Sequence, residues 1–225
     1  MKRLQSTINN NLTTHSFLYS GRYVSITCEN KTRIDECIRA GRWYEHKMLG
    51  LITRTSRAGV FLDIGGNVGH HSVYFSLFCP STKVMVFEPL LEHIQLIRKN
   101  VVDNKLEEKV KIYPFGAANL ISSFEMTTNA AQFQRKVSSI CMPLDFILGE
   151  TVSVIKIDVE GMKEQVITGL RNTIIRDAPD IYVECLTTTQ LNTMIELLNN
   201  LNYSIDKTDM NLLKTYKFVP DWLSH

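Results

Sequence analysis

The sequence predicts an α/β fold: a mostly parallel sheet with helices on both of its faces. Short apolar runs alternate with helical runs from about residue 58 onward, and this alternation is typical of β-α-β units. The apolar runs are almost continuous, as expected for parallel strands that are covered on both faces. Several of them also end on an acidic residue, which places charge at one edge of the predicted sheet.

Length and composition suit a single domain, with residues 1–57 as an N-terminal extension, or cap, and residues 58–225 as the main part. The chain has 225 residues, of which 44% are hydrophobic and 21% charged. It can therefore bury a sizeable core, and it is not a disordered chain. No apolar run reaches the roughly 18 residues of a membrane span, and no signal peptide is recognisable. The cysteines are odd in number and lack C-x-x-C spacing, so we expect buried thiols in the cytoplasm.

The cap has little regular pattern. Residues 1–15 are polar and rich in asparagine, so we expect them to fray. Residues 21–29 alternate like a short strand. Residues 35–53 have a helical pattern that Gly41 and Gly50 interrupt.

The main part contains a regular succession of predicted elements. The strands are predicted at residues 59–63, 83–89, 109–115, 152–161 and 180–185. The helices are predicted at residues 68–78, 90–104, 162–174 and 188–201. Two further strands, at residues 203–206 and 212–218, would form an antiparallel pair at the edge of the sheet. The weakly patterned residues 120–141 suit either a hairpin or a mobile flap.

Acidic residues stand at the ends of four predicted strands. They are Asp63, Glu88, Asp158 with Glu160, and Glu184. In a doubly wound sheet, the carboxyl ends of the strands border the ligand crevice. A single acid there could be a helix cap or a turn residue, but four together indicate a site.

A glycine-rich loop, DIGGNVG at residues 63–69, joins the first of these strands to the first helix. It lacks the G-x-G-x-x-G pattern of dinucleotide sites, which disfavours a nicotinamide-dependent oxidoreductase. The acid followed by glycines suits a ligand with an amine and a carboxylate, and the glycines would let it approach the backbone. Glu88, at the end of the second strand, could accept hydrogen bonds from a ribose diol. An amino acid joined to a ribose describes S-adenosyl-L-methionine (SAM).

Six segments of the chain resemble the FkbM family of SAM-dependent methyltransferases. They are GRWYE, DIGGNVG, VFEP, YPFGAAN, PLDFI and IKIDVEGMKEQVITGL, which lie between about residues 41 and 185. The resemblance implies the class I methyltransferase fold with a final antiparallel strand pair. It also implies O-methylation of a hydroxyl on a sugar or another small molecule. Gly66 stands where the family commonly has alanine.

The resemblance assigns the cofactor site residue by residue. It implies that the methionine end contacts Asp63, Gly65, Gly66, Asn67 and Gly69. It implies that the ribose contacts Glu88, which Pro89 follows, and that the adenine contacts Phe115, Gly116 and Ala117. His70 and His71 come next after the loop, and either could touch the cofactor, although a plain role at the start of the helix is the simpler interpretation.

The run KIDVEG carries the candidate catalytic residues. Lys156, Asp158 and Glu160 have a spacing of two, so they are predicted to share one face of a strand. Asp158 would bind the acceptor hydroxyl or the cofactor amine and help to remove a proton, with Glu184 as a second candidate base. A purely structural network of Lys156 with these carboxylates is the alternative. We favour a metal-free site over a divalent cation on Asp158, Glu160 and Glu184.

Two further functions stay open besides small-molecule methylation. An RNA 2′-O-methyltransferase would use two lysines, an aspartate and a glutamate, of which Lys47, Asp158 and Glu184 could supply three. No lysine lies between Lys163 and Lys207 to supply the fourth. A non-catalytic subunit with this fold is disfavoured by the intact loop. Acceptor choice is expected to lie in the cap and in residues 120–141.

Overall fold

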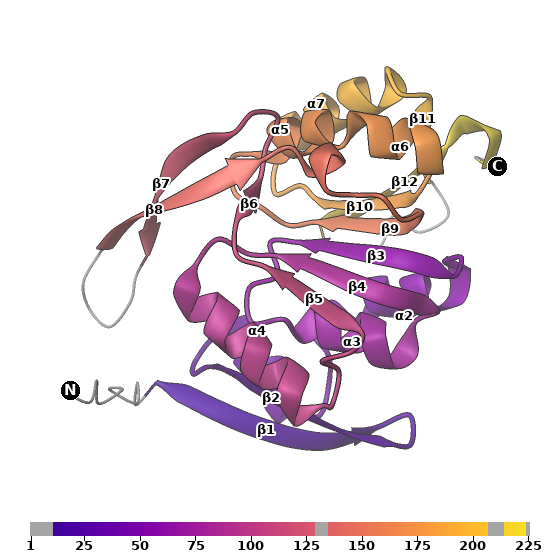
Figure 1. The fold of residues 1–225 in the computed structure, drawn as a ribbon. Coiled ribbons are helices and arrows are strands. Elements are labelled where there is room, and N and C mark those ends of the chain that lie inside the picture. Colours follow the sequence, from indigo (N-terminus) through magenta and orange to yellow (C-terminus); the bar gives the residue numbers. More distant parts are fainter. Residues whose placement is uncertain (1–10, 129–134, 207–213, 224–225) are drawn as a thin grey trace.

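A seven-stranded sheet forms the centre of the protein, in a computed structural model that describes residues 11–128, 135–206 and 214–223. The strand order is β11-β12-β10-β9-β3-β4-β5 (Figure 1). The strands are β3 (Gly59–Ile64), β4 (Ser81–Phe87), β5 (Val110–Tyr113), β9 (Val152–Ile157), β10 (Asp180–Glu184), β11 (Tyr203–Ile205) and β12 (Thr215–Pro220). Strands β3, β4, β5, β9 and β10 are parallel, whereas β12 is antiparallel to both of its neighbours. The predicted mostly parallel sheet with an antiparallel C-terminal pair is therefore confirmed.

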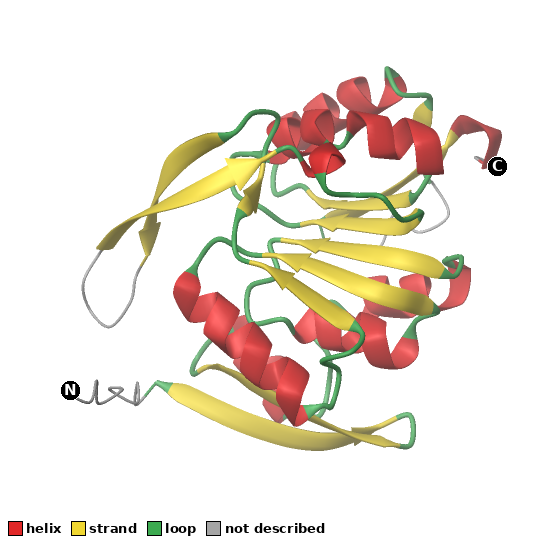
Figure 2. Cartoon of the chain, in the orientation of Figure 1, coloured by secondary structure: helices red, strands yellow, loops and turns green. Residues whose placement is uncertain are grey.

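Helices cover both faces of this sheet, in three layers (Figure 2). One layer contains α2 (His46–Thr55), α3 (His70–Phe78) and α4 (Leu91–Asp103), and the other contains α5 (Lys163–Gly169), α6 (Arg171–Asp177) and α7 (Thr188–Asn199). Alternate strand residues face opposite layers, so Phe61 packs in one core and Leu62 in the other. The predicted helix at residues 162–174 divides at Leu170 into α5 and α6.

The N-terminal part folds as a hairpin of β1 (Leu12–Tyr19) and β2 (Arg22–Glu29). The expectation that residues up to 15 fray is therefore wrong for residues 12–15, while residues 1–10 lie outside the described part. Aromatic packing explains the order, since Phe17 and Tyr19 lie edge-on to the buried Trp43, with ring centroids 5.5 and 6.1 Å away.

The predicted helix at residues 35–53 is two helices, α1 (Arg33–Arg39) and the α2 described above. Gly41 and Glu45 between them both have left-handed backbone conformations, with φ of +68° and +53°. Glycine adopts this conformation readily, whereas glutamate adopts it only at an energetic cost. The break between α1 and α2 is therefore imposed by the surrounding structure and not by the residue type of Glu45. Gly50, by contrast, lies within α2 and does not interrupt it.

Two asparagines, Asn100 on α4 and Asn104 at its C-cap, hold the hairpin to the body of the protein. Asn100 Oδ1 accepts the Thr27 N–H at 2.7 Å, and its Nδ2 donates to the Thr27 carbonyl at 2.9 Å. One turn further on, the Asn104 amide makes the same pair of bonds with Ser25, at 3.0 and 2.7 Å. Four residues of a helix rise by about 6 Å, and two residues of a strand rise by about 6.7 Å. The two side-chain amides are therefore spaced like the two residues of β2 that they contact, and they make the backbone hydrogen bonds that a neighbouring strand would make. Asn100 Nδ2 also donates to the Val68 carbonyl, at 2.7 Å.

A second small sheet projects from the carboxyl end of the central strands (Figure 1). It contains β6 (Gly116–Ala117), β7 (Ser122–Thr128) and β8 (Arg135–Met142), in the order β6-β8-β7. Of the two structures expected for residues 120–141, the hairpin is therefore the one observed, and residues 129–134 at its tip lie outside the described part. Two short 3-10 helices, η2 (Leu144–Phe146) and η4 (Asp221–Leu223), complete the elements of the described ranges.

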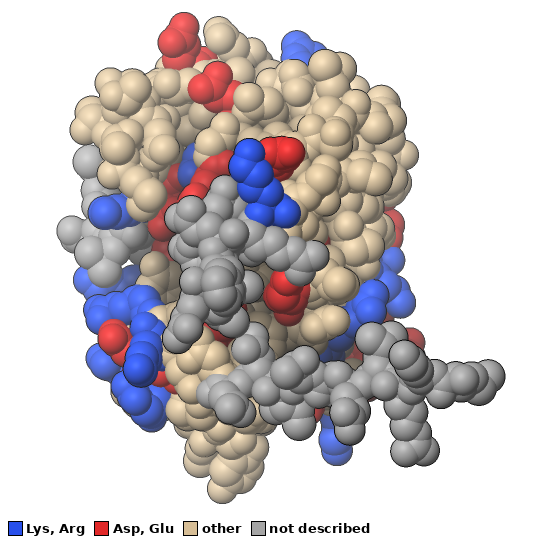
Figure 3. Space-filling view, turned by 90° about the vertical axis from the view of Figure 1, so that its left-hand side faces the viewer, with Lys and Arg blue, Asp and Glu red and all other residues tan. Residues whose placement is uncertain are grey.

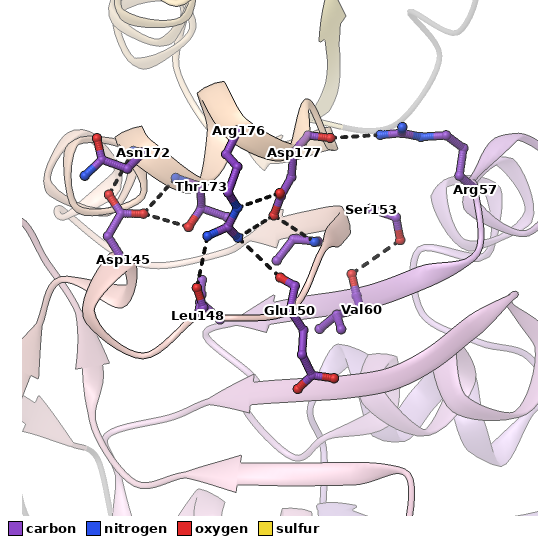
Figure 4. Close-up of polar contacts among 11 residues, drawn as sticks. Arg57, Val60, Asp145, Leu148, Glu150, Ser153, Asn172, Thr173, Arg176 and Asp177 are labelled. Carbon is purple, nitrogen blue, oxygen red and sulfur yellow. Dashed lines mark hydrogen bonds and ion pairs between the residues drawn. The ribbon is translucent and has the colours of Figure 1, made fainter.

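An arginine and an aspartate at the end of α6 tie this helix to the amino edge of the sheet (Figure 4). Arg176 Nε and Nη2 both donate to the Asp177 carboxylate at 2.7 Å. The same guanidinium donates to the carbonyls of Leu148 and Glu150, at 3.2 and 3.3 Å. Asp177 in turn accepts the N–H of Val152, the first residue of β9, at 2.9 Å.

Two further residues complete the contacts at this edge. Asp145 accepts the N–H groups of Asn172 and Thr173 and the Thr173 hydroxyl, and so caps the first turn of α6. Arg57 donates to the Ala178 carbonyl at 2.7 Å. The amino edge is therefore a closed set of pairs that fixes the positions of helices and strands.

Two global features complete the description. No helix in the described ranges combines the length and apolarity needed to cross a membrane. All five cysteines are free thiols, and all but Cys37 are buried, as expected for small apolar core residues.

Candidate active site

Acidic side chains gather where the parallel strands end. Figure 3 views the molecule from this side, the left of Figure 1, and acidic side chains lie around the centre of that face with basic ones beside them. Asp63 is the penultimate residue of β3, and Glu184 is the last residue of β10. Glu88 directly follows β4, and Asp158 directly follows β9. Because these strands are parallel, the fold brings the predicted acids to one edge.

Lys156 is the cation at the centre of this cluster. Its Nζ lies 3.2 Å from Asp63 Oδ1 and 3.5 Å from Asp158 Oδ2, and it donates to the Gly65 carbonyl at 3.2 Å. Burial alone would lower the pKa of Lys156, but Asp63, Asp158 and Glu45 raise it above the ordinary lysine value. Lys156 therefore carries its charge and joins β3, β9 and the glycine loop.

Asp63 differs from the expectation that it lines the methionine end. Its side chain has no exposed surface. One carboxylate oxygen accepts the Ser72 hydroxyl at 2.6 Å, and the other faces Lys156. Asp63 is thus positioned beneath the loop, where it anchors Lys156 and the start of α3.

The glycine loop packs closely against other parts of the chain. Gly65 has φ of +80°, and a Cβ placed there would lie 1.9 Å from the Asp158 carbonyl oxygen. A Cβ on Gly66 would lie 2.3 Å from a methyl group of Val86. The sequence analysis explained these glycines by the close approach of a ligand to the backbone. Contacts within the fold already leave no room for a side chain at Gly65 and Gly66.

Glu88 is held by backbone groups of two loops. Its Oε2 accepts the N–H of Asn67 in the glycine loop, and its Oε1 accepts the N–H of Leu90, both at 2.9 Å. His93 Nδ1 lies 3.4 Å from Oε1. Burial would lower the pKa of His93, but the nearby carboxylate of Glu88 raises it above its usual value. His93 was missed by the sequence reasoning, although its position in the first turn after Glu88 could have suggested it.

The residues predicted for the adenine end lie beside Glu88. The Phe115 ring packs 5.9 Å from the rings of both Phe87 and Tyr113. Gly116 and Ala117 form β6, which pairs with β8. The Pro89 carbonyl accepts a hydrogen bond from Ser139 of β8, at 3.2 Å. The small sheet therefore borders the predicted cofactor site.

The carboxyl groups of Asp158 and Glu184 lie at the ends of neighbouring strands, close enough for each to shift the pKa of the other. Burial would raise the pKa of Asp158, but Lys156, the neighbouring carboxyl group of Glu184 and Lys163 hold it below its usual value. Burial and the neighbouring Asp158 raise the pKa of Glu184 to about 7. At neutral pH the pair therefore holds a proton on Glu184 for part of the time, while Asp158 stays ionised.

Glu160 does not join this pair. Strand β9 ends at Ile157, and Glu160 is exposed in the turn before α5, so it does not share a strand face with Lys156. In the described ranges, the one group of at least three residues with metal-ligand types at close range is His15, Cys28 and Asp35, in the cap. The three carboxylates of the cation alternative are thus not brought together.

The cap contributes two residues that the sequence reasoning did not select, Tyr44 and Glu45. Glu45 Oε1 accepts the Thr215 hydroxyl at 2.7 Å, and its Oε2 lies 3.5 Å from His71 Nε2. Burial raises the pKa of Glu45, and burial also raises that of Tyr44, with Glu45, Glu184 and Asp158 adding to it. The segment GRWYE carried the family resemblance, but nothing in its pattern indicated that it reaches the acid cluster.

The comparisons with known proteins agree with this geometry. The model of the methyltransferase FkbM domain matches residues 63–205. A methyltransferase FkbM from Methylobacillus flagellatus KT is 16% identical with a TM-score of 0.56, over 72% of this chain and 43% of that chain. The chain thus spans less than half of that structure's length.

Other solved structures share the fold, with lower sequence identities and TM-scores. A tRNA methyltransferase of M. jannaschii is 13% identical with a TM-score of 0.51, over 93% of this chain and 53% of that chain. A precorrin 8w decarboxylase from the Methanobacterium thermoautotrophicum genome is 12% identical with a TM-score of 0.51, over 77% and 86%. No curated protein matches the chain.

At such identities these structures show the fold alone, whereas the domain match covers most of the chain, from the glycine loop to β11. It includes the loop, Glu88, the Lys156–Asp158 pair and Glu184. The chain belongs to the FkbM family of methyltransferases.

Proposed function

We propose that this protein is a SAM-dependent methyltransferase whose acceptor is a hydroxyl on a sugar or another small molecule. Membership of the FkbM family supports methyl transfer. The carboxyl pair of Asp158 and Glu184 at the carboxyl edge supports a hydroxyl acceptor, and it is the observation that carries the proposal.

The residues around the glycine loop fit SAM. Glu88 is a fixed carboxylate at the end of β4, and such a group accepts hydrogen bonds from a ribose diol. Phe115, Gly116 and Ala117 would border the adenine. The methionine end would lie between the loop and Asp158, where the acids favour the positive charges of its ammonium and sulfonium groups.

SAM, when bound, supplies a methyl group on a positively charged sulfur, so that transfer is a displacement by the acceptor oxygen. The chain's own contribution is alignment and proton removal. Glu184 would take the hydroxyl proton, because a base is most useful when its pKa lies near the working pH. Asp158, held by Lys156, would orient Glu184 and the hydroxyl. Such a base typically contributes about 10²–10⁴-fold to the rate.

The acid-rich edge argues against a polyanionic acceptor. Asp158, Glu184 and Glu45 lie together there, and they would repel the phosphates of an RNA. Lys47, which the RNA alternative requires, is exposed on α2 and makes no ion pair with any described residue. A neutral polyhydroxy acceptor fits the same edge without a charge penalty.

Calorimetry tests the cofactor half of the proposal. We expect SAM and S-adenosylhomocysteine to bind with at least micromolar affinity, about −8 kcal/mol, and NAD not to bind. Glu88→Ala should weaken S-adenosylhomocysteine by about 1.5–3 kcal/mol, because it removes a charged acceptor. Wild-type protein that binds neither SAM nor S-adenosylhomocysteine would exclude the proposal.

A screen of sugars and small hydroxyl compounds, against capped RNA, tests the acceptor half. With a working acceptor, the single-turnover rate should fall about tenfold for each pH unit below about 7 and level off above it, as Glu184 loses its proton. Methylation of RNA but of no small hydroxyl compound would contradict the acceptor class.

A further inference from the structure

Three side chains of metal-ligand type converge in the cap, and none of them belongs to the candidate active site. His15 lies on β1, Cys28 on β2 and Asp35 on α1. One imidazole nitrogen, the thiol sulfur and one carboxylate oxygen all lie within 4.8 Å of one another. Cys28 and Asp35 are buried, whereas the His15 side chain is 17% exposed. The cluster is therefore enclosed by protein and can be reached from solvent on the side of His15.

The register of the hairpin sets the spacing of the first two residues. Thr13 pairs with Cys28 and His15 pairs with Ile26, so His15 and Cys28 are diagonal neighbours on one face of the two strands. Helix α1 contacts both strands, and the short distance between Asp35 and His15 shows that it packs on this same face. Two strands and a helix thus bring one ligand atom each to a single point.

Asp35 is already held in the position of a ligand. Its Oδ2 accepts the Lys31 N–H at 3.1 Å, and its own N–H donates to the Thr32 hydroxyl at 3.1 Å. Its Oδ1 lies 2.7 Å from His15 Nε2. Hydrogen bonds of this kind orient a ligating carboxylate and are typical of metal sites. The oxygen that faces His15 is the one that a metal ion would use.

We propose that His15, Cys28 and Asp35 bind a zinc ion, which joins β1, β2 and α1. Nitrogen, sulfur and oxygen ligands together suit zinc, whereas calcium and magnesium prefer oxygen ligands alone. Zinc bonds of about 2.0–2.3 Å in tetrahedral geometry need ligand atoms about 3.4–3.6 Å apart. The His15–Asp35 pair would open by about 0.7 Å to admit the ion. A water molecule would complete the four ligands.

The alternative is an ion pair of His15 with Asp35, in which Cys28 is an apolar neighbour. Cys28 packs with Val68 and Leu96, so this role is open to it. The two interpretations differ in whether the Cys28 sulfur has a chemical partner. A measurement that detects sulfur coordination therefore separates them.

Metal binding is measured on the full chain, purified without a histidine tag and freed of metal with a chelator. Zinc chloride, added in competition with a chelating dye, should bind with one ion per chain, and calcium or magnesium chloride should not displace it. Cobalt(II), added in place of zinc, should give a thiolate-to-cobalt charge-transfer band in the near ultraviolet, because this band requires a bound cysteine. The band should be absent in Cys28→Ala.

Two variants and two matched controls locate the ion. Cys28→Ala and His15→Gln should each weaken zinc by at least about 100-fold, since losing an outer partner alone costs about 10-fold to 100-fold. The controls Cys37→Ala and His46→Gln change a thiol on α1 and an imidazole on α2, and they should shift the dissociation constant by less than about 2-fold. Zinc at about 100 times its dissociation constant should raise the melting temperature of the wild type by about 5–10 °C and leave that of Cys28→Ala unchanged.

His15→Gln decides the question if Cys28→Ala does not fold. Wild-type protein that binds no zinc would overturn the inference. Equal zinc affinity in the wild type and the folded ligand variants would do the same, and so would cobalt binding without the thiolate band. None of these outcomes bears on SAM binding, so the proposed function is tested separately.

Discussion

The amino and carboxyl edges of the same sheet use their charged residues in different ways. At the amino edge, every carboxylate oxygen of Asp145 and Asp177 accepts a hydrogen bond from an N–H or O–H group of the chain (Figure 4). Arg176 donates to one carboxylate and to two backbone carbonyls. At the carboxyl edge, acids outnumber the bases beside them, so that Glu184 has a raised pKa. A closed set of pairs stabilises the fold, whereas an unbalanced set remains available to a ligand.

The largest expected effect tests whether the carboxyl edge also contains purely structural contacts. Gly65→Ala should cost about 3 kcal/mol or more, because its Cβ would meet the Asp158 carbonyl in a left-handed conformation. Urea unfolding measures this cost. The control is Gly149→Ala, where a Cβ meets nothing within 4 Å, and we expect less than about 0.5 kcal/mol. Gly65→Ala protein of normal stability would show that this contact is not constrained as described.

The second effect separates chemistry from stability at the carboxyl edge. Asp158→Asn should lower the single-turnover rate by about 10²-fold, because the pair loses its ionised member. The melting temperature should change little, since Lys156 keeps Asp63 as a partner. A stable variant with wild-type turnover would exclude Asp158 from the chemistry.

The third effect is its counterpart at the amino edge. Asp177→Ala should cost about 2–3 kcal/mol of stability, because it leaves the Val152 N–H without its acceptor and removes the carboxylate partner of Arg176. The affinity for S-adenosylhomocysteine in the folded protein should stay at the wild-type value. A loss of affinity without a loss of stability would contradict the comparison of the two edges.

The smallest effect depends on pH. The pKa of Glu184 is raised from 4.5 in the unfolded chain to about 7 in the fold, so its stabilising contribution is complete below pH 4.5 and is lost as the pH rises through 7. Glu184→Gln should therefore stabilise the protein at pH 8 but not at pH 4.5. Because the side chain is partly solvated, we expect only about 1 kcal/mol, or about 2–4 °C in melting temperature. Equal shifts at both pH values would show that Glu184 has an ordinary pKa.

The sequence predicted the sheet and its acidic edge because both depend on local pattern. Apolar runs of strand length gave the strands, and parallel strands necessarily bring Asp158 and Glu184 to one edge. Glu160 was placed wrongly because a spacing of two was extended past Ile157, where the strand ends. A local pattern does not show where a strand stops.

Contacts from outside the sheet could not be predicted in this way. Tyr44 and Glu45 reach the acids from a turn between two helices, and Glu45 has a left-handed backbone that its residue type does not favour. β1 was missed because its stability comes from β2 and Trp43, not from its own composition. These positions depend on how elements dock, and docking has no short-range signal.

The Asn100 amide connects β2 of the cap with the Val68 carbonyl of the glycine loop. Local opening of the hairpin must therefore release a contact of the loop as well, and the two openings are linked. A ligand that stabilises the loop should slow hydrogen–deuterium exchange at the Thr27 and Ser25 amides, although neither belongs to the proposed site. Exchange at these two positions would report cofactor occupancy from the opposite side of α4, without any methyl acceptor.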